Sequence, residues 1–216
     1  PGAGMIRFHF ALLRHGVTAW NAEKRIQGRS DIALLPETIG EYRQLRLPEK
    51  WQSIPWKVSP LIRTIQTATA LGITGITPDE HWIEMNWGEW EGEKLADLRR
   101  RWGAEIQANE DRGWDFRPDG GESPRDVLVR VKIALAQHND GHKDDRDDDD
   151  HGDFGVVTHK GVIRAVYAAA CGWNMMGKSP DKLDWKAMHV FSWSDTDGLG
   201  MVALNQPLIA KDGTGR

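Results

Sequence analysis

The chain has 216 residues, of which 39% are hydrophobic, and this is enough for one sizeable core. Its formal net charge is −4, which excludes the basic surface typical of nucleic-acid binding, so any anion must be bound by local positive charge. No apolar run reaches the roughly 18 residues of a spanning helix, and we expect no membrane contact. Cys171 is the single cysteine, which excludes a disulfide framework and favours a cytoplasmic location.

Apolar residues alternate along 6–12, the pattern of a strand, and this strand stops at Arg14 and His15. The short segment 56–60 predicts a second strand. The apolar run 154–159 predicts a third strand, which ends at His159. Two predicted strands therefore end in a histidine, and ligands of parallel sheets bind beyond the carboxyl ends of the strands.

Helices are predicted where apolar residues recur every three or four positions. They cover Pro36–Leu47, Leu61–Leu71, Leu95–Ile106, Ser123–His138 and Lys160–Gly172. Ser123 can cap the fourth helix, with Asp126 at the third position of a capping box. Two late strands, 188–193 and 201–204, flank a polar turn and predict an antiparallel pair. This order indicates a three-layer α/β/α sandwich, with a mostly parallel central sheet and an antiparallel C-terminal hairpin.

We predict one domain over residues 5–210. The four residues before Met5 are interpreted as an expression remnant. Residues 139–153 are predicted to be an acidic, flexible loop, which contains the run from Asp144 to Asp150. Histidines flank this run, but adjacent like charges lack the spacing of a metal-ligand set, so we expect no metal site in the chain.

Arg14-His15-Gly16 is weak evidence by itself, since a tripeptide recurs by chance. Other motifs follow it, however: Thr18, Trp20 and Asn21; RIQGRSD at 25–31; Arg63 after Ser-Pro; Glu84 before WGEWEG; and THKG at 158–161. Together they resemble the histidine phosphatase superfamily, which contains cofactor-dependent phosphoglycerate mutase, over nearly the whole chain. The resemblance implies the phosphoglycerate mutase-like fold.

The residue types suit phosphoryl transfer, which needs the charge on the peripheral phosphate oxygens to be neutralised. Arg14 and Arg63 can each offer a planar fork to two oxygens, and N–H groups at helix starts add dipoles. A neutral imidazole at His15 can attack phosphorus. Taken singly, each residue could instead be structural: an arginine in a surface ion pair, or a hydrogen-bonded histidine.

The resemblance implies that His15 becomes a phosphohistidine and that His159 lies beside it, where a cationic ring would stabilise the transition state. It makes Glu84 the general acid and base. If Trp82 and Trp87 enclose this carboxyl, desolvation raises its pKa. The remaining candidates, for substrate binding, are Thr18, Asn21, Gln27, Gly28 and Lys160.

Two departures from the family pattern bear on function. Lys160 stands where a small residue is frequent, and its ammonium group would favour an anionic substrate. The mutases carry an Arg-His-Tyr run and a longer insertion after the acid, where this chain has MNWGEWEGEKLADLRRRWG. The second departure favours a metal-independent phosphatase that uses no cofactor and acts on a phosphorylated small molecule.

Three alternatives stay open: a phosphoglycerate mutase, a phosphohistidine or phosphotyrosine protein phosphatase, and a binding module without turnover. The sequence also leaves a homodimer open.

Overall fold

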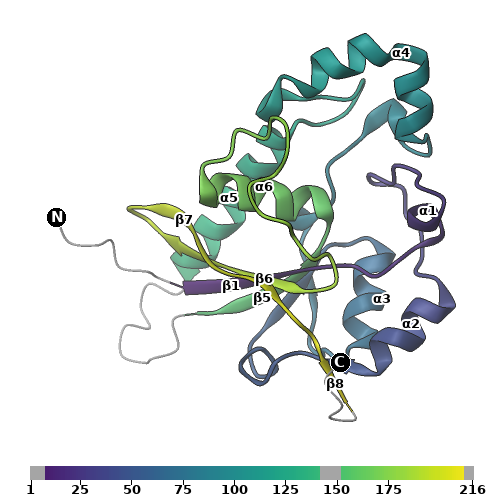
Figure 1. Cartoon of the computed structure of the whole chain (residues 1–216). Helices are drawn as coiled ribbons and strands as arrows, with labels where there is room; N and C mark the ends of the chain where they lie inside the picture. The colour runs from purple at the N-terminus through teal and green to yellow at the C-terminus, as the bar shows by residue number, and fades with distance from the viewer. Residues whose placement is uncertain (1–7, 142–151, 212–216) are drawn as a thin grey trace.

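The structure is a computed structural model of the chain and describes residues 8–141 and 152–211. A six-stranded sheet forms its centre (Figure 1), and its strands are arranged in the order β4-β3-β5-β1-β6-β7. Its strands are β1 Phe8–Arg14, β3 Trp56–Val58, β4 Thr77–Pro78, β5 Phe154–Thr158, β6 Met188–Ser194 and β7 Gly198–Gln206. The first four in the spatial order are parallel, and β6 and β7 form an antiparallel hairpin beside β1. The predicted sandwich is confirmed.

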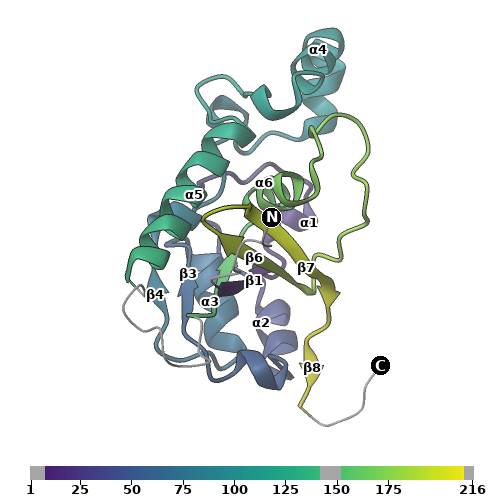
Figure 2. The ribbon, with the colours of Figure 1, turned by 90° about the vertical axis from the view of Figure 1, so that its left-hand side faces the viewer.

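Helices cover both faces of the sheet (Figure 2). They are α1 Ala19–Ala22, α2 Pro36–Arg43, α3 Ile62–Ala70, α4 Leu95–Glu110, α5 Pro124–Gly141 and α6 Lys160–Cys171. The alternation in β1 divides the core, because successive side chains of a strand point to opposite faces. Phe8, Phe10 and Leu12 pack with α5 and α6, whereas Ala11 and Leu13 pack on the side of α2 and α3. The chain therefore buries both faces of its central strand.

Within the described residues, four 3₁₀ turns lie in the connections: η1 Glu49–Trp51, η2 Glu80–Trp82, η3 Gly88–Trp90 and η4 Gly113–Asp115. The start of α5 has the predicted capping box, with Ser123 N–H bound to the Asp126 carboxylate at 2.9 Å and Asp126 N–H bound to Ser123 Oγ at 3.2 Å. Helix α4 has a kink at Trp102, where the backbone is not helical. No helix in the two described ranges is long and apolar enough to cross a bilayer.

Some predicted boundaries were wrong. The helix at Pro36 ends at Arg43, because the next residues form β2 (Leu45–Arg46) and pair with β8 (Ile209–Ala210). Helix α5 continues to Gly141, so the predicted acidic loop cannot begin at 139. The acidic run at 144–150 lies outside the described residues.

Candidate active site

The parallel pairing of β1 with β5 sets the two histidines side by side. Arg14 is in register with Thr158, so His15 and His159 both follow directly at the same edge of the sheet. The His15 N–H donates to the Thr158 carbonyl at 3.0 Å, and the centroids of the two imidazole rings are 5.2 Å apart. The pairing of two strands that are far apart in the sequence therefore forms the floor of the site.

His15 is held in one tautomer. Its Nδ1 lies 2.7 Å from the Gly16 carbonyl, which can only accept, so Nδ1 carries the hydrogen and Nε2 carries the lone pair. Burial, followed by the positive charges of Arg63 and Arg14, holds the pKa of His15 well below its ordinary value of 6.5. The ring is therefore neutral near neutral pH, with Nε2 available as a nucleophile.

The two arginines lie within the electrostatic reach of His15. Arg63 is fully buried, and its two terminal nitrogens donate to the carbonyls of Ser30 at 2.7 Å and Gly28 at 2.6 Å. The guanidinium of Arg14 lies 5.8 Å from the ring centroid of Trp185. Burial lowers the pKa of both arginines, and Glu84 is the main charge that opposes this shift.

His159 completes the floor of the site. Its Nε2 lies 2.7 Å from Ser59 Oγ, a residue within the predicted strand 56–60 that the sequence analysis did not select for the site. Burial and the charge of Arg63 hold the pKa of His159 well below 6.5. The ring is therefore neutral in this structure, and the cationic His159 envisaged from the sequence is not what its surroundings favour.

Three buried nitrogens at this site make no hydrogen bond within the described residues: Arg14 Nε, Arg63 Nε and His159 Nδ1. They are three of five such side-chain atoms in the described part of the chain, and the other two are indole nitrogens. A buried donor without a partner costs about 1–3 kcal/mol. The unpaired Nε donors of Arg14 and Arg63, together with the neutral imidazole of His15, are suited to binding an anion that has several acceptor oxygens.

Glu84 is buried, with 8% of its surface exposed. The Met85 N–H donates to its Oε1 at 2.8 Å, and the Gly161 N–H donates to its Oε2 at 3.3 Å. Burial raises its pKa above 4.5 and outweighs these hydrogen bonds and the charge of Arg63. Trp82 lies in the core against Phe10, and Trp87 packs against Trp90 and Phe116.

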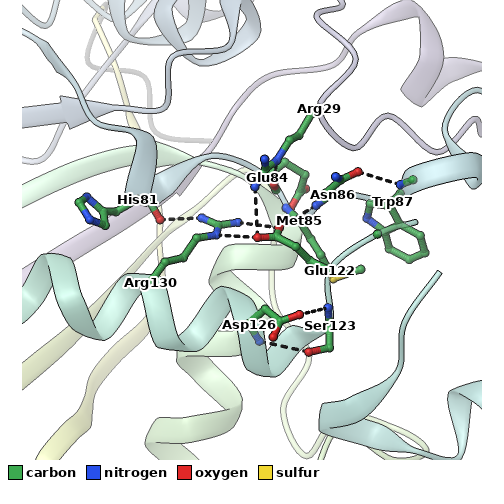
Figure 3. Close-up of polar contacts among 12 residues, drawn as sticks. Arg29, His81, Glu84, Met85, Asn86, Trp87, Glu122, Ser123, Asp126 and Arg130 are labelled. Atoms are coloured by element: carbon green, nitrogen blue, oxygen red, sulfur yellow. Dashed lines mark hydrogen bonds and ion pairs between the residues drawn. The ribbon is translucent and has the colours of Figure 1, made fainter. Parts of the chain in front are cut away.

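A network around Glu122 anchors the segment that carries Glu84 (Figure 3). The Glu122 carboxylate accepts from the Asn86 N–H at 2.8 Å and pairs with Arg29 at 3.1 Å and Arg130 at 3.3 Å. Arg130 also donates to the His81 carbonyl at 2.6 Å. The network ties both sides of Glu84 to α5. The sequence analysis placed a helix start at Ser123 and did not select Glu122.

The loop at 27–30 positions Arg63. Gly28 has a positive φ of 52°, and a Cβ there would lie 2.0 Å from Glu91 Oε1, so a side chain does not fit. Glu91 holds the loop through the N–H groups of Arg29 at 2.8 Å and Ser30 at 3.0 Å. Gly28, a predicted substrate-binding residue, thus contributes its carbonyl to Arg63, and Glu91 is a supporting residue that sequence reasoning missed.

Thr18, Asn21 and Gln27 form a hydrogen-bonded group at the start of α1. Thr18 Oγ1 donates to Gln27 Oε1 at 2.7 Å, and the Thr18 N–H donates to Asn21 Oδ1 at 3.0 Å. The Asn21 side-chain NH₂ makes no hydrogen bond within the described residues and can still donate. Thr18 and Gln27 are buried, which gives them a supporting place in the site.

Lys160 is exposed at the first turn of α6, with its ammonium group 5.2 Å from the Trp185 ring centroid.

The sequence analysis expected backbone N–H groups at helix starts to help bind the phosphate, and the structure corrects this for two of them. The Ile62 N–H at the start of α3 donates to Asp31 at 2.8 Å, and the Gly161 N–H donates to Glu84. Carboxylates of the chain therefore already use these two donors.

The described residues contain no group of three histidine, cysteine, aspartate or glutamate side chains placed to hold a metal ion. The histidines at 142 and 151 lie outside those residues.

Comparisons with known proteins agree with this arrangement. The family model of the histidine phosphatase superfamily (branch 1) matches residues 10–204. Phosphoglycerate mutase-like protein 4 of Arabidopsis thaliana is 30% identical over 195 residues, which cover 86% of this chain and 80% of that protein. A probable phosphoglycerate mutase, GpmB of Salmonella choleraesuis, is 34% identical over 140 residues, covering 58% of this chain and only 60% of its own length.

Among solved structures, a mycobacterial glucosyl-3-phosphoglycerate phosphatase superposes with a TM-score of 0.70 at 26% identity. The match covers 92% of this chain and 98% of that one. The region that the family model matches includes both strand-end histidines, the two arginines and the buried glutamate. The chain belongs to the histidine phosphatase superfamily, branch 1.

Proposed function

We propose that the protein is a phosphatase that hydrolyses phosphomonoesters of small molecules through a phosphohistidine on His15, with Glu84 as the acid and base. One observation carries the proposal: Arg14 and Arg63, whose charges both act on His15, each have an Nε donor without a partner in the described residues, and the His15 Nε2 carries a lone pair. Phosphate oxygens satisfy such donors, and the phosphorus they hold is then within reach of the nucleophile.

In the first step, the Nε2 lone pair of His15 attacks phosphorus and the phosphorus–oxygen bond to the alcohol breaks. Burial raises the pKa of Glu84, which favours its protonated form, and this acid gives its proton to the departing oxygen. The phosphorylated ring is cationic, and its Nδ1–H keeps its hydrogen bond to the Gly16 carbonyl. The products are a phosphoenzyme, a free alcohol and a Glu84 carboxylate.

In the second step, the Glu84 carboxylate takes a proton from water, and the water oxygen attacks phosphorus. The phosphorus–nitrogen bond breaks, which restores neutral His15, protonated Glu84 and inorganic phosphate. The arginines stabilise the charge on the peripheral oxygens in both steps. No step calls for a metal or another cofactor. We place the reaction in a reducing cellular compartment, because the single cysteine, Cys171, is free.

A mutase is the second candidate, since two relatives carry that name. It differs in the acceptor, because a second phosphoglycerate molecule replaces water. The segment after Glu84 lacks the Arg-His-Tyr run of the mutases and instead holds Trp87 and Trp90, packed on Phe116. This difference favours water as the acceptor.

The test is a screen of phosphorylated metabolites and phosphopeptides ranked by kcat/KM, with 3-phosphoglycerate assayed with and without a bisphosphoglycerate primer. We expect one inorganic phosphate released per ester consumed. Primer-dependent formation of 2-phosphoglycerate without phosphate release would establish the mutase instead. Tight binding without turnover across the whole screen would contradict both enzymes and favour a binding module.

A further inference from the structure

A cavity of about 390 Å³ adjoins the site on the side of Glu84. It lies between α4, the start of α6 and the segment that follows α6. Trp87, Phe116, Leu95 and Met175 give it an aromatic and apolar wall. Pockets of this size hold small molecules whose apolar body rests on such walls and whose polar groups meet a few fixed side chains.

The cavity meets the catalytic residues at the Glu84 carboxylate. Met85 and Gly161 line the cavity, and their N–H groups bind the two oxygens of Glu84. An alcohol whose oxygen receives a proton from Glu84 is therefore next to this cavity when it leaves. The space is placed for the leaving group, whereas the phosphoryl group remains with the arginines and His15.

Arg164 is the cation of this cavity without a carboxylate partner. The cavity also contains Arg99, which pairs with Glu110 at 2.5 Å, and Asp111, which accepts a hydrogen bond from Gln107 at 2.8 Å. Arg164 makes no ion pair within the described residues, and its guanidinium lies 5.4 Å from the Trp173 ring centroid.

The carboxylates of Glu110 and Asp111 also line the cavity, but neither forms an ion pair with Arg164. Burial is the one cause that shifts its pKa, downward, and no acid raises it, in contrast to Arg14 and Arg63. Lys160, one helical turn earlier, feels this charge, because Arg164 helps to lower the pKa of Lys160. Lys160 and Arg164 are thus one helical turn apart on α6, and of the two it is Arg164 that lines the cavity.

We propose that this cavity binds a leaving alcohol that carries its own anionic group, with Arg164 as the residue that selects it. The substrates are phosphomonoesters with an apolar or aromatic body and a second anion, such as a carboxylate, close to the ester. This inference rests on the proposed phosphatase function. It specifies what the site selects, whereas the reaction itself depends on His15 and Glu84.

The test uses two nearly isosteric substrates, 3-carboxyphenyl phosphate and 3-carbamoylphenyl phosphate, which differ in the charge of the leaving group. We expect the wild type to prefer the carboxylate in kcat/KM. The Arg164→Gln variant should lose about 10- to 100-fold on the carboxylate, the range of a hydrogen bond to a charged group, and much less on the amide. Arg164→Lys should recover part of the loss.

Arg100→Gln is the matched control, because it removes the same charge from an exposed position of α4 outside the cavity. It should change both substrates equally and by less than about two-fold, as expected for surface charges screened by salt. Equal losses on the two substrates for Arg164→Gln would overturn the inference, since they would mean that Arg164 only packs against Trp173.

Binding of the alcohols 3-hydroxybenzoate and 3-hydroxybenzamide, followed by NMR titration, separates this inference from the proposed function. If neither ester is hydrolysed, the phosphatase proposal fails. The cavity assignment then stands only if the wild type binds the benzoate more tightly than the benzamide and Arg164→Gln abolishes this difference. Equal binding of the two alcohols would overturn it.

Discussion

The Gly161→Ala variant tests the role of Glu84 as the general acid without removing the Glu84 side chain. Gly161 is the second residue of α6, and a Cβ built there lies 2.4 Å from Glu84 Oε1. Ordinary van der Waals contact begins at 3.4 Å, so the carboxylate oxygen must move by about 1 Å, the difference between these two distances. The oxygen can do so because it is the end of a flexible side chain.

The expected loss follows from that displacement. A shift of about 1 Å in a catalytic group can cost about 10²-fold in rate. The fold should survive, because alanine is a better helix former than glycine by up to about 1 kcal/mol, which offsets the local strain. The melting temperature should therefore stay within a few degrees of the wild-type value while the acid step becomes slower.

Single-turnover phosphorylation by an alkyl phosphate and by p-nitrophenyl phosphate measures this effect. The alkyl phosphate should lose about 10²-fold and p-nitrophenyl phosphate much less, because p-nitrophenolate leaves without a proton. Gly40→Ala, in α2, is the control, since a Cβ there meets nothing within 4 Å. It should be slightly stabilising with unchanged rates. Full activity of Gly161→Ala on both substrates would refute the reasoning.

Three further predictions concern Glu84 and the phosphate charge. Glu84→Gln should slow phosphorylation by an alkyl phosphate about 10²- to 10⁴-fold and by p-nitrophenyl phosphate much less, whereas Arg63→Ala should slow both alike; equal losses for Glu84→Gln would place the acid elsewhere. The raised pKa of Glu84 means that its favourable contribution to stability is complete below pH 4.5 and is lost as pH rises through the folded-state pKa. The melting temperature of Glu84→Gln should therefore exceed that of the wild type above the folded-state pKa of Glu84 and equal it below pH 4.5. A difference in melting temperature that stays constant over this pH range would contradict the assignment. Arginines supply the charge that metal ions supply in other phosphatases, so turnover should persist in excess EDTA. Loss of turnover in EDTA that is restored by adding back one metal ion would contradict this prediction.

The sequence was informative where local pattern and chemistry coincide. The alternating run at 6–12 and the buried run at 154–159 predicted the two central strands, and their last residues led to His15 and His159. Because side chains at parallel strand ends meet at one edge, these patterns predicted that the two histidines lie together, as they do.

Long-range contacts could not be predicted in the same way. The helix at Pro36 ends early because Leu45 pairs with Ala210, and no local pattern shows a partner so distant in the chain. Glu122 directly precedes the predicted helix start at Ser123 and was not selected, although its carboxylate anchors the segment that holds Glu84. The neutral state of His159 depends on its burial and on the nearby charge of Arg63, and a single sequence shows neither that burial nor how close the two side chains lie.

The central claim is that His15 carries the phosphoryl group. Rapid quench of the enzyme with a phosphomonoester, followed by peptide mapping, tests it most directly. The account predicts one phosphoryl group on His15, stable in alkali and lost in acid as a phosphoramidate is, and absent from His15→Ala, whose kcat falls by at least about 10³-fold. A phosphoryl group on serine, or an alanine variant with near-normal turnover, would contradict it.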